Sequence, residues 1–319
     1  MATSVLRAAC VVPVLFADVD AGMDIVASHQ PLDRHVNRAV VNDRGATFRP
    51  MVTDVDGAHV AWREAGRGPV MLLLHGLGGS RLSWEPQLEG LSDRFRVVAW
   101  DLPGYGASPP LSLDEPVTFA ALADAVVALA DELGADRVHL VGISFGGMIA
   151  QYAASRHPDR VETLALLSTS ARFGLDGTTL AVWRAARLAP LDAGLEPADF
   201  ALDVLRAISG PHITDAALDG QRAAMARVSG AALRRSIDCL VTHDSTSILH
   251  RIVAPTMCVV GALDAETPPS YATHLAAHIA GATVHVVPDA GHLVNVEAPD
   301  IVNDLLASHA RDARRSVHP

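Results

Sequence analysis

The chain has 319 residues, of which 50% are hydrophobic and 19% charged, a composition typical of a soluble globular protein. Its 25 basic and 36 acidic side chains give a formal net charge of −11, so it lacks the basic surface that nucleic-acid binding requires. All of the basic side chains are arginine. The absence of lysine excludes phosphate-loop NTPases and Schiff-base enzymes, because both classes need a lysine amine.

Residues 1–48 are expected to form a loosely held extension, apart from the folded domain. An apolar run at 8–17 resembles the core of a secretory signal, but a single arginine precedes it and Pro13 interrupts it. We therefore predict a cytoplasmic protein, with secretion through this run as the alternative. No apolar stretch reaches the roughly 20 residues of a membrane-spanning helix.

The cysteines and histidines predict neither a disulfide framework nor a metal site. Cys10, Cys239 and Cys258 are odd in number and lack Cys-x-x-Cys spacing, so we expect free, buried thiols. His274 and His278 lie four residues apart on an expected helix, but no carboxylate lies at a useful spacing. They are interpreted as two surface histidines, and no bound metal is expected.

Strand and helix signals alternate from residue 51 onward. Residues 51–66 predict a β-hairpin with its turn at Asp56-Gly57, because polarity alternates on both sides. Apolar runs typical of strands covered on both faces follow at 70–75, 97–100, 138–142, 163–168, 257–261 and 284–287. Apolar residues at helical spacing predict helices between them, as at 119–133 and 148–157. The fold class is therefore α/β, with a parallel, doubly wound sheet.

The alternation breaks once, over residues 172–248. This stretch carries several helical segments and no convincing strand, and prolines and glycines punctuate it. It is too long for a loop in a compact domain, so we predict an inserted helical cap. The α/β core then comprises 49–171 and 249–310, and 311–319 form a C-terminal tail.

Ser144 lies in Gly142-Ile143-Ser144-Phe145-Gly146, where an expected strand ends and an expected helix begins. A hydroxyl at the apex of such a turn is exposed at the carboxyl edge of the sheet, where open α/β sheets bind ligands. The turn brings neighbouring backbone so close that only small residues fit two positions before and two after the serine. The glycines at both positions predict a nucleophile elbow.

A serine hydroxyl needs a base to take its proton, and the base needs a carboxylate that orients it. Asp264 follows the strand at 257–261, and His292 lies in the loop between the last strand and the final helix. The chain order Ser, Asp, His predicts a catalytic triad of Ser144, Asp264 and His292. Asp289 is the alternative acid, but it lies in the same loop as His292 and would have to fold back.

A glycine-rich loop, His75-Gly76-Leu77-Gly78-Gly79, follows the strand at 70–75. Such a loop can turn N–H groups toward a reacting carbonyl, and we expect the backbone N–H groups of Leu77 and Phe145 to form the oxyanion hole. A dinucleotide-binding loop is the alternative, but the glycines do not match Gly-x-Gly-x-x-Gly.

Four motifs together resemble the α/β-hydrolase fold family, over about residues 50–310. They are HGLGG (75–79), DLPGYGAS (101–108), GISFGG (142–147), and the Asp264/His292 pair in GALDAETPP and DAGHLVNVEAP. The resemblance implies an eight-stranded, mostly parallel sheet, a cap inserted after the sixth strand, and no cofactor. Within the family, residues 261–299 are most similar to 3-oxoadipate enol-lactonase and its relatives, whereas the cap does not match that pattern and the N-terminal extension departs from it.

The expected function is that of a serine hydrolase, which cleaves a small or medium carboxylic ester or lactone through an acyl-enzyme on Ser144. Trp183, Leu188 and Phe200 are candidates to cover this small-molecule substrate, although they fit the core of the cap equally well. Two alternatives stay open. The same machinery serves carbon–carbon bond hydrolases of this family, and a receptor can keep the triad with negligible turnover. The oligomeric state is also open.

Overall fold

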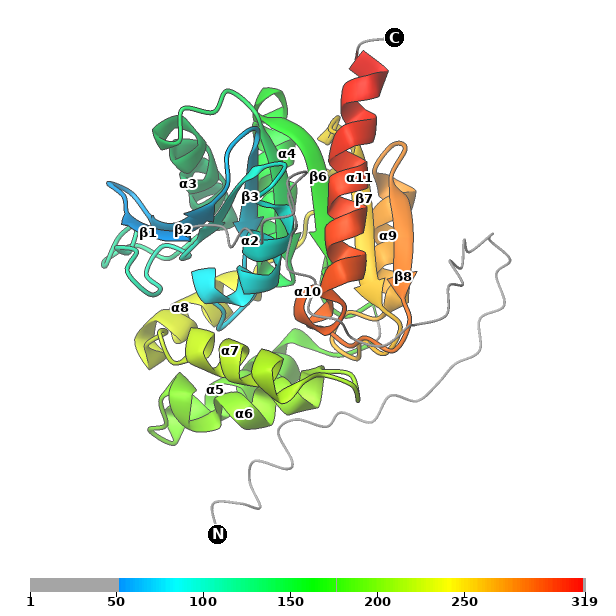
Figure 1. Ribbon diagram of the computed structural model, residues 1–319. Coiled ribbons are helices and arrows are strands. Elements are labelled where there is room, and N and C mark those ends of the chain that lie inside the picture. The colour runs from blue at the N-terminus through cyan, green and yellow to red at the C-terminus, as the bar shows by residue number, and fades with distance from the viewer. Residues whose placement is uncertain (1–51, 176, 318–319) are drawn as a thin grey trace. The chain divides into compact units, whose positions relative to one another are not determined.

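The computed structural model describes residues 52–175 and 177–317, so the expected extension at 1–48 lies outside the described residues. The described part holds one eight-stranded sheet, in the order β1-β2-β4-β3-β5-β6-β7-β8 (Figure 1). The predicted α/β class with a mostly parallel sheet is thereby confirmed.

The sheet begins with the predicted hairpin. β1 (Thr53–Asp56) pairs with β2 (Ala61–Ala65) in antiparallel register, and the N–H of Gly57 donates to the C=O of Val60 across the turn (3.1 Å). β2 also pairs antiparallel with β4 (Arg96–Trp100). The sheet is therefore mixed at this edge, as many large α/β sheets are.

The other strands run parallel to β4 and to one another. They are β3 (Val70–Leu74), β5 (Val138–Ile143), β6 (Val161–Leu167), β7 (Thr256–Gly261) and β8 (Thr283–Val287). β3, β5 and β7 are buried along their whole length, as their continuous apolar sequences predict. β8 differs from that expectation, because it is the last strand of the sheet and is mostly half-buried.

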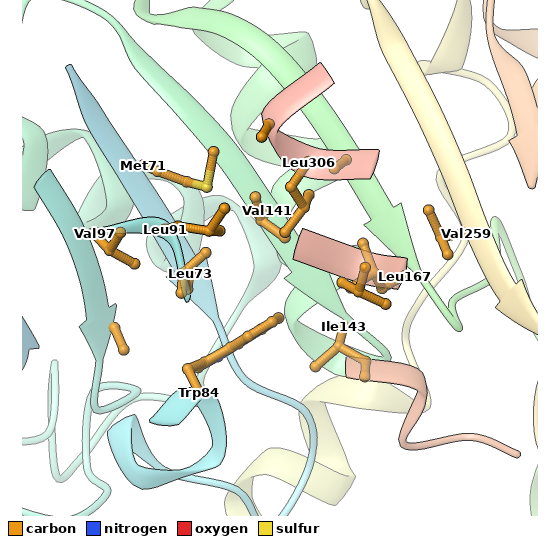
Figure 2. Packing of buried hydrophobic residues seen from close by; sticks show 14 of the residues in the cluster. Met71, Leu73, Trp84, Leu91, Val97, Val141, Ile143, Leu167, Val259 and Leu306 are labelled. Carbon is orange, nitrogen blue, oxygen red and sulfur yellow. The ribbon is translucent and has the colours of Figure 1, made fainter. Parts of the chain in front are cut away.

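Helices cover both faces of the sheet. Alternate residues of the parallel strands point to one face, where they form a continuous apolar cluster with α2 (Glu85–Leu91) and α11 (Pro299–Val317). Figure 2 shows part of this cluster, including Leu73, Val141 and Leu167 from neighbouring strands. α3 (Phe119–Glu132) and α4 (Phe145–Arg156) pack on the opposite face, and α9 (Pro269–His278) packs against β7 and β8.

Helix α11 continues beyond residue 310, where the sequence places the start of the tail. Its buried residues include Val302, Leu306 and Ala310, and the same side of the helix is still buried at Ala313. None of the described helices is both long enough and apolar enough to cross a membrane.

Four α-helices between β6 and β7 form a group, which we call the cap. They are α5 (Leu180–Asp192), α6 (Pro197–Ile208), α7 (Asp215–Met225) and α8 (Gly230–Leu240). The side chains of Thr179, Thr214 and Ser229 accept N–H groups of the first turns of α5, α7 and α8, as N-cap residues do. In Figure 1 these helices lie together beyond the carboxyl ends of β6 and β7.

Both described cysteines are free and buried, as predicted. Burial raises the pKa of the Cys239 and Cys258 thiols to about 12, so neither is a thiolate at neutral pH. Cys10 lies outside the described residues.

Candidate active site

Ser144 lies at a sharp turn between β5 and α4, where its backbone adopts φ 53° and ψ −119°. A residue with a Cβ rarely takes a positive φ, and the conformation persists only where the surroundings fix it. Here the N–H of Ser144 donates to the C=O of Leu167 (2.9 Å). The C=O of Ser144 accepts from the Thr169 hydroxyl (2.7 Å) and the Met148 N–H (3.0 Å). The turn thus holds a partly buried serine at the carboxyl end of β5.

The two glycines of the motif are required by the available space. A Cβ on Gly142 would lie 2.3 Å from the C=O oxygen of Gly146, and a Cβ on Gly146 would lie 2.1 Å from that of Leu74. Both contacts are to backbone atoms, which cannot yield unless β3 or α4 moves. The steric demand that predicts an elbow from the sequence is therefore present in the structure.

Asp264 and His292 come together at the same edge of the sheet. Asp264 lies three residues after the end of β7, and His292 lies in the loop between β8 and α10 (Val294–Glu297). The Nδ1 of His292 lies 2.9 Å and 3.0 Å from the two carboxylate oxygens of Asp264, and both residues are buried. With Nδ1 donating to the carboxylate, Nε2 of the neutral ring carries no proton and can act as a base.

The Asp264 carboxylate is also held by its own loop. It accepts the N–H groups of Glu266 and Thr267 and the Thr267 hydroxyl, each at 2.9 Å. The alternative acid, Asp289, is exposed, whereas Asp264 is 3% exposed and contacts His292. The geometry therefore favours Asp264 as the acid that orients the histidine.

Opposing effects act on the pKa values of these two groups. Burial raises the pKa of Asp264, but the attraction of His292 and the hydrogen bonds from His292 and Thr267 outweigh burial, so the pKa lies below its usual range. Burial lowers the pKa of His292, but the Asp264 carboxylate and the charge of Glu266 outweigh burial, so the pKa lies above 6.5. Asp264 is therefore an ion at neutral pH, as an orienting acid must be.

We expect hydrolysis to fall as the pH drops through the raised pKa of His292. The ring must be neutral to accept a proton, and the Asp264 carboxylate raises its pKa above that of an ordinary histidine. A profile of kcat/KM against pH measures this ionisation in the free protein. A profile that stays flat down through the ordinary histidine range would contradict the raised pKa of His292.

The glycine-rich loop after β3 lies against the serine. A Cβ on Gly76 would come within 3.2 Å of the Ser144 Cβ. The C=O of Gly76 accepts from Nδ1 of His75 (2.9 Å) and from the N–H of Gly79 (3.0 Å). Because the C=O and N–H of one trans peptide point to opposite sides, these bonds also fix the direction of the Leu77 N–H.

His75 makes contacts with the glycine-rich loop that its motif alone does not reveal. The ring is fully buried, and burial lowers its pKa, so the ring is neutral. Its Nε2 accepts the N–H of Leu102 (3.0 Å), which leaves Nδ1–H to donate to Gly76. The second expected oxyanion donor, Phe145, begins α4, where N–H groups have no partner within the helix.

The three expected substrate contacts lie in the cap helices. Leu188 and Phe200 are each 4% exposed, whereas Trp183 is partly buried. The Trp183 ring packs against Phe173 (centroids 4.8 Å apart) and under the Arg187 guanidinium (5.3 Å from the ring centroid). Contacts of this kind also occur in the core of a cap. A role of the three residues in substrate binding therefore stays a prediction.

Other contacts to the candidate site were not predicted from the sequence. Arg187, on α5, binds both carboxylate oxygens of Glu266, two residues after Asp264. Met225, at the end of α7, lies 3.6 Å from where a Cβ on Gly78 would stand, so it packs on the glycine-rich loop. No local pattern marks these residues, because their partners lie far away in the chain.

Known proteins resemble this chain along most of its folded part. Residues 69–194 match the family described as the alpha/beta hydrolase fold. A pimeloyl-(acyl-carrier protein) methyl ester esterase of Chromobacterium violaceum is 34% identical over 237 residues, which cover 71% of this chain and 88% of that protein. A solved hydrolase from Pseudomonas aeruginosa PA01 is 30% identical, with a TM-score of 0.71, and the match covers 81% of this chain and 97% of that chain. The enol-lactonase from Burkholderia xenovorans LB400 is 25% identical, with a TM-score of 0.64, over 81% of this chain and 99% of that chain.

The chain therefore belongs to the α/β-hydrolase fold family. The membership that four sequence motifs indicate is confirmed, together with the eight-stranded sheet that it implies.

Proposed function

We propose that this chain is a serine hydrolase that cleaves a small or medium carboxylic ester or lactone through an acyl-enzyme on Ser144. The observation that carries the proposal is the buried Asp264–His292 pair, which lies at the same sheet edge as the strained Ser144 turn. The relatives support the choice of bond, since one is named a methyl ester esterase and a solved neighbour is an enol-lactonase.

The proposed reaction begins when Nε2 of His292 takes the Ser144 proton and Oγ attacks the carbonyl carbon. The N–H groups of Leu77 and Phe145 then stabilise the oxyanion, an effect worth about 3 kcal/mol per donor. His292 returns its proton to the leaving alcohol, and the acyl group stays on the serine. Water attacks this ester next, again with His292 as base, while Asp264 holds the ring throughout.

The contacts of the cap with loops of the core argue for a small or medium substrate. Arg227, after α7, pairs with the buried Asp101 (3.1 Å), and Arg187 pairs with Glu266. Helices held in this way over the carboxyl ends of the strands exclude water and bulky chains alike. Long acyl chains need a broad apolar opening, and polypeptides need an extended groove.

We therefore expect acetyl to hexanoyl esters and five- or six-membered lactones to be cleaved far better than hexadecanoyl esters or casein. The measurement is kcat/KM across acyl chain length, with the rate of the Ser144→Ala variant subtracted as background. A rise toward hexadecanoyl would make the protein a lipase and contradict the small pocket. A flat profile near zero would favour the carbon–carbon hydrolase or the receptor.

A further inference from the structure

The carboxylate of Glu297 binds three backbone N–H groups where the cap meets the loop between β8 and α10, which carries His292 and which we call the histidine loop. Its Oε2 accepts from Gly210 (2.7 Å) and Gly291 (2.8 Å), and its Oε1 accepts from Leu293 (2.9 Å). Gly291 and Leu293 are the two neighbours of His292, and Gly210 lies in the cap between α6 and α7. One side chain therefore holds the backbone on each side of the proposed base and ties both to the cap.

The backbones of the cap and the histidine loop also meet directly at this junction. The N–H of His292 donates to the C=O of Ile208, at the end of α6 (2.9 Å). A Cβ on Gly291 would lie 2.4 Å from the N of Gly210 and 2.8 Å from the C=O oxygen of Ile208. No side chain fits between the two segments, so a shift of one moves the other.

A carboxylate is the group that fits this set of donors. Its two oxygens only accept hydrogen bonds, and bonds from N–H groups to an ionised acceptor are the strong ones. Glutamine has the same shape but a single acceptor oxygen. If that oxygen faces Gly210 and Gly291, the amide NH₂ faces the N–H of Leu293, and two donors oppose each other.

We propose that Glu297 is a positioning residue, which sets His292 against Ser144 through the backbone of the loop and touches neither the substrate nor the ring. The proposal rests on the proposed serine hydrolase function. The hydrogen bond to Asp264 fixes the tautomer of His292 and the position of its Nδ1. The backbone of the loop sets the position of the whole ring relative to Ser144. Such placement matters, because a displacement of about 1 Å can cost about 100-fold in rate.

The test compares Glu297→Gln and Glu297→Ala with a matched control, Glu196→Gln. The Glu196 carboxylate also accepts a glycine N–H, that of Gly230 (2.7 Å), but both residues lie within the cap. The readout is the rate constant at which a small organophosphonate labels Ser144, followed across pH. A merely structural loss lowers the amount of protein labelled, whereas a misplaced base lowers the rate constant.

We expect labelling to slow about 10-fold in Glu297→Gln and about 100-fold in Glu297→Ala, with no change in Glu196→Gln. The acidic limb of the labelling profile should also move toward lower pH in Glu297→Gln. Two causes act in this direction: His292 moves away from Asp264, the charge that raises its pKa, and the negative charge of Glu297 beside the loop is lost, while Glu266 and Arg187 still face the ring.

Rate constants equal to those of the parent chain in both Glu297 variants would overturn the proposal. An equal loss in Glu196→Gln would overturn it as well, because the effect would then be general loosening of the cap. If Glu297→Ala does not fold, the isosteric Glu297→Gln decides alone. Failure of the parent chain to be labelled at Ser144 would instead overturn the serine hydrolase function itself.

Discussion

Ser144→Ala is expected to lose both hydrolysis and covalent labelling by an organophosphonate, while the melting temperature stays close to that of the parent chain. Loss of the nucleophile in a serine triad lowers kcat by about 10⁶-fold. Alanine and serine both carry a Cβ, so holding residue 144 at a positive φ costs about the same in both. The turn between β5 and α4 should therefore keep its conformation. Ester turnover, mass spectrometry of the labelled protein and thermal unfolding measure the three quantities.

The outcome separates the hydrolase from its alternatives. Hydrolysis that persists undiminished in Ser144→Ala would exclude an acyl-enzyme at this residue. A parent chain that is labelled at Ser144 but turns over no ester would favour the receptor or the carbon–carbon hydrolase.

Asp264→Asn is expected to lower kcat by about 10⁴-fold with the structure intact, as the same exchange does in serine proteases. The surroundings of the carboxylate strengthen this expectation. Its Oδ1 accepts two N–H groups, from Glu266 and Thr267, so the single oxygen of asparagine will take that position. The amide NH₂ then replaces Oδ2 and donates to Nδ1 of His292, which leaves the proton on Nε2.

Asp289→Asn is the control, because Asp289 is exposed and lies in the same loop as His292. Its turnover should match that of the parent chain in the same ester assay. If Asp264→Asn retained near-normal turnover while Asp289→Asn lost it, the role of the acid would pass to Asp289.

The sequence is sufficient for features whose physical cause is local. The elbow around Ser144 depends on clashes among residues within one turn and a neighbouring strand, so two glycines reveal it. The buried strands are visible as short apolar runs, and the hairpin as an alternating pattern around Asp56-Gly57. Asp264 and His292 could be paired because both follow the carboxyl ends of parallel strands, which meet at one edge of a sheet.

Features that depend on distant pairs could not be predicted. Glu297 and Gly210 lie 87 residues apart, and Arg187 and Glu266 lie 79 residues apart. At such separations a contact produces no recognisable motif in the sequence. The partial exposure of β8 follows from its place at the edge of the sheet. The sequence of one strand does not reveal the order of the strands in the sheet, so this exposure could not be predicted. Helix α11 continues past the predicted boundary at residue 310, and its last turns carry few apolar residues from which this could be read.

The positive φ at Ser144 is a cost in stability at the position of the proposed nucleophile. Holding a residue with a Cβ in such a conformation costs about 1–3 kcal/mol, a sizeable part of the 5–15 kcal/mol by which domains are typically stable. Glycine adopts a positive φ without that cost. In the proposed serine hydrolase, glycine in place of this one serine would therefore relieve the backbone strain and remove the nucleophile, while the sheet and the cap are kept.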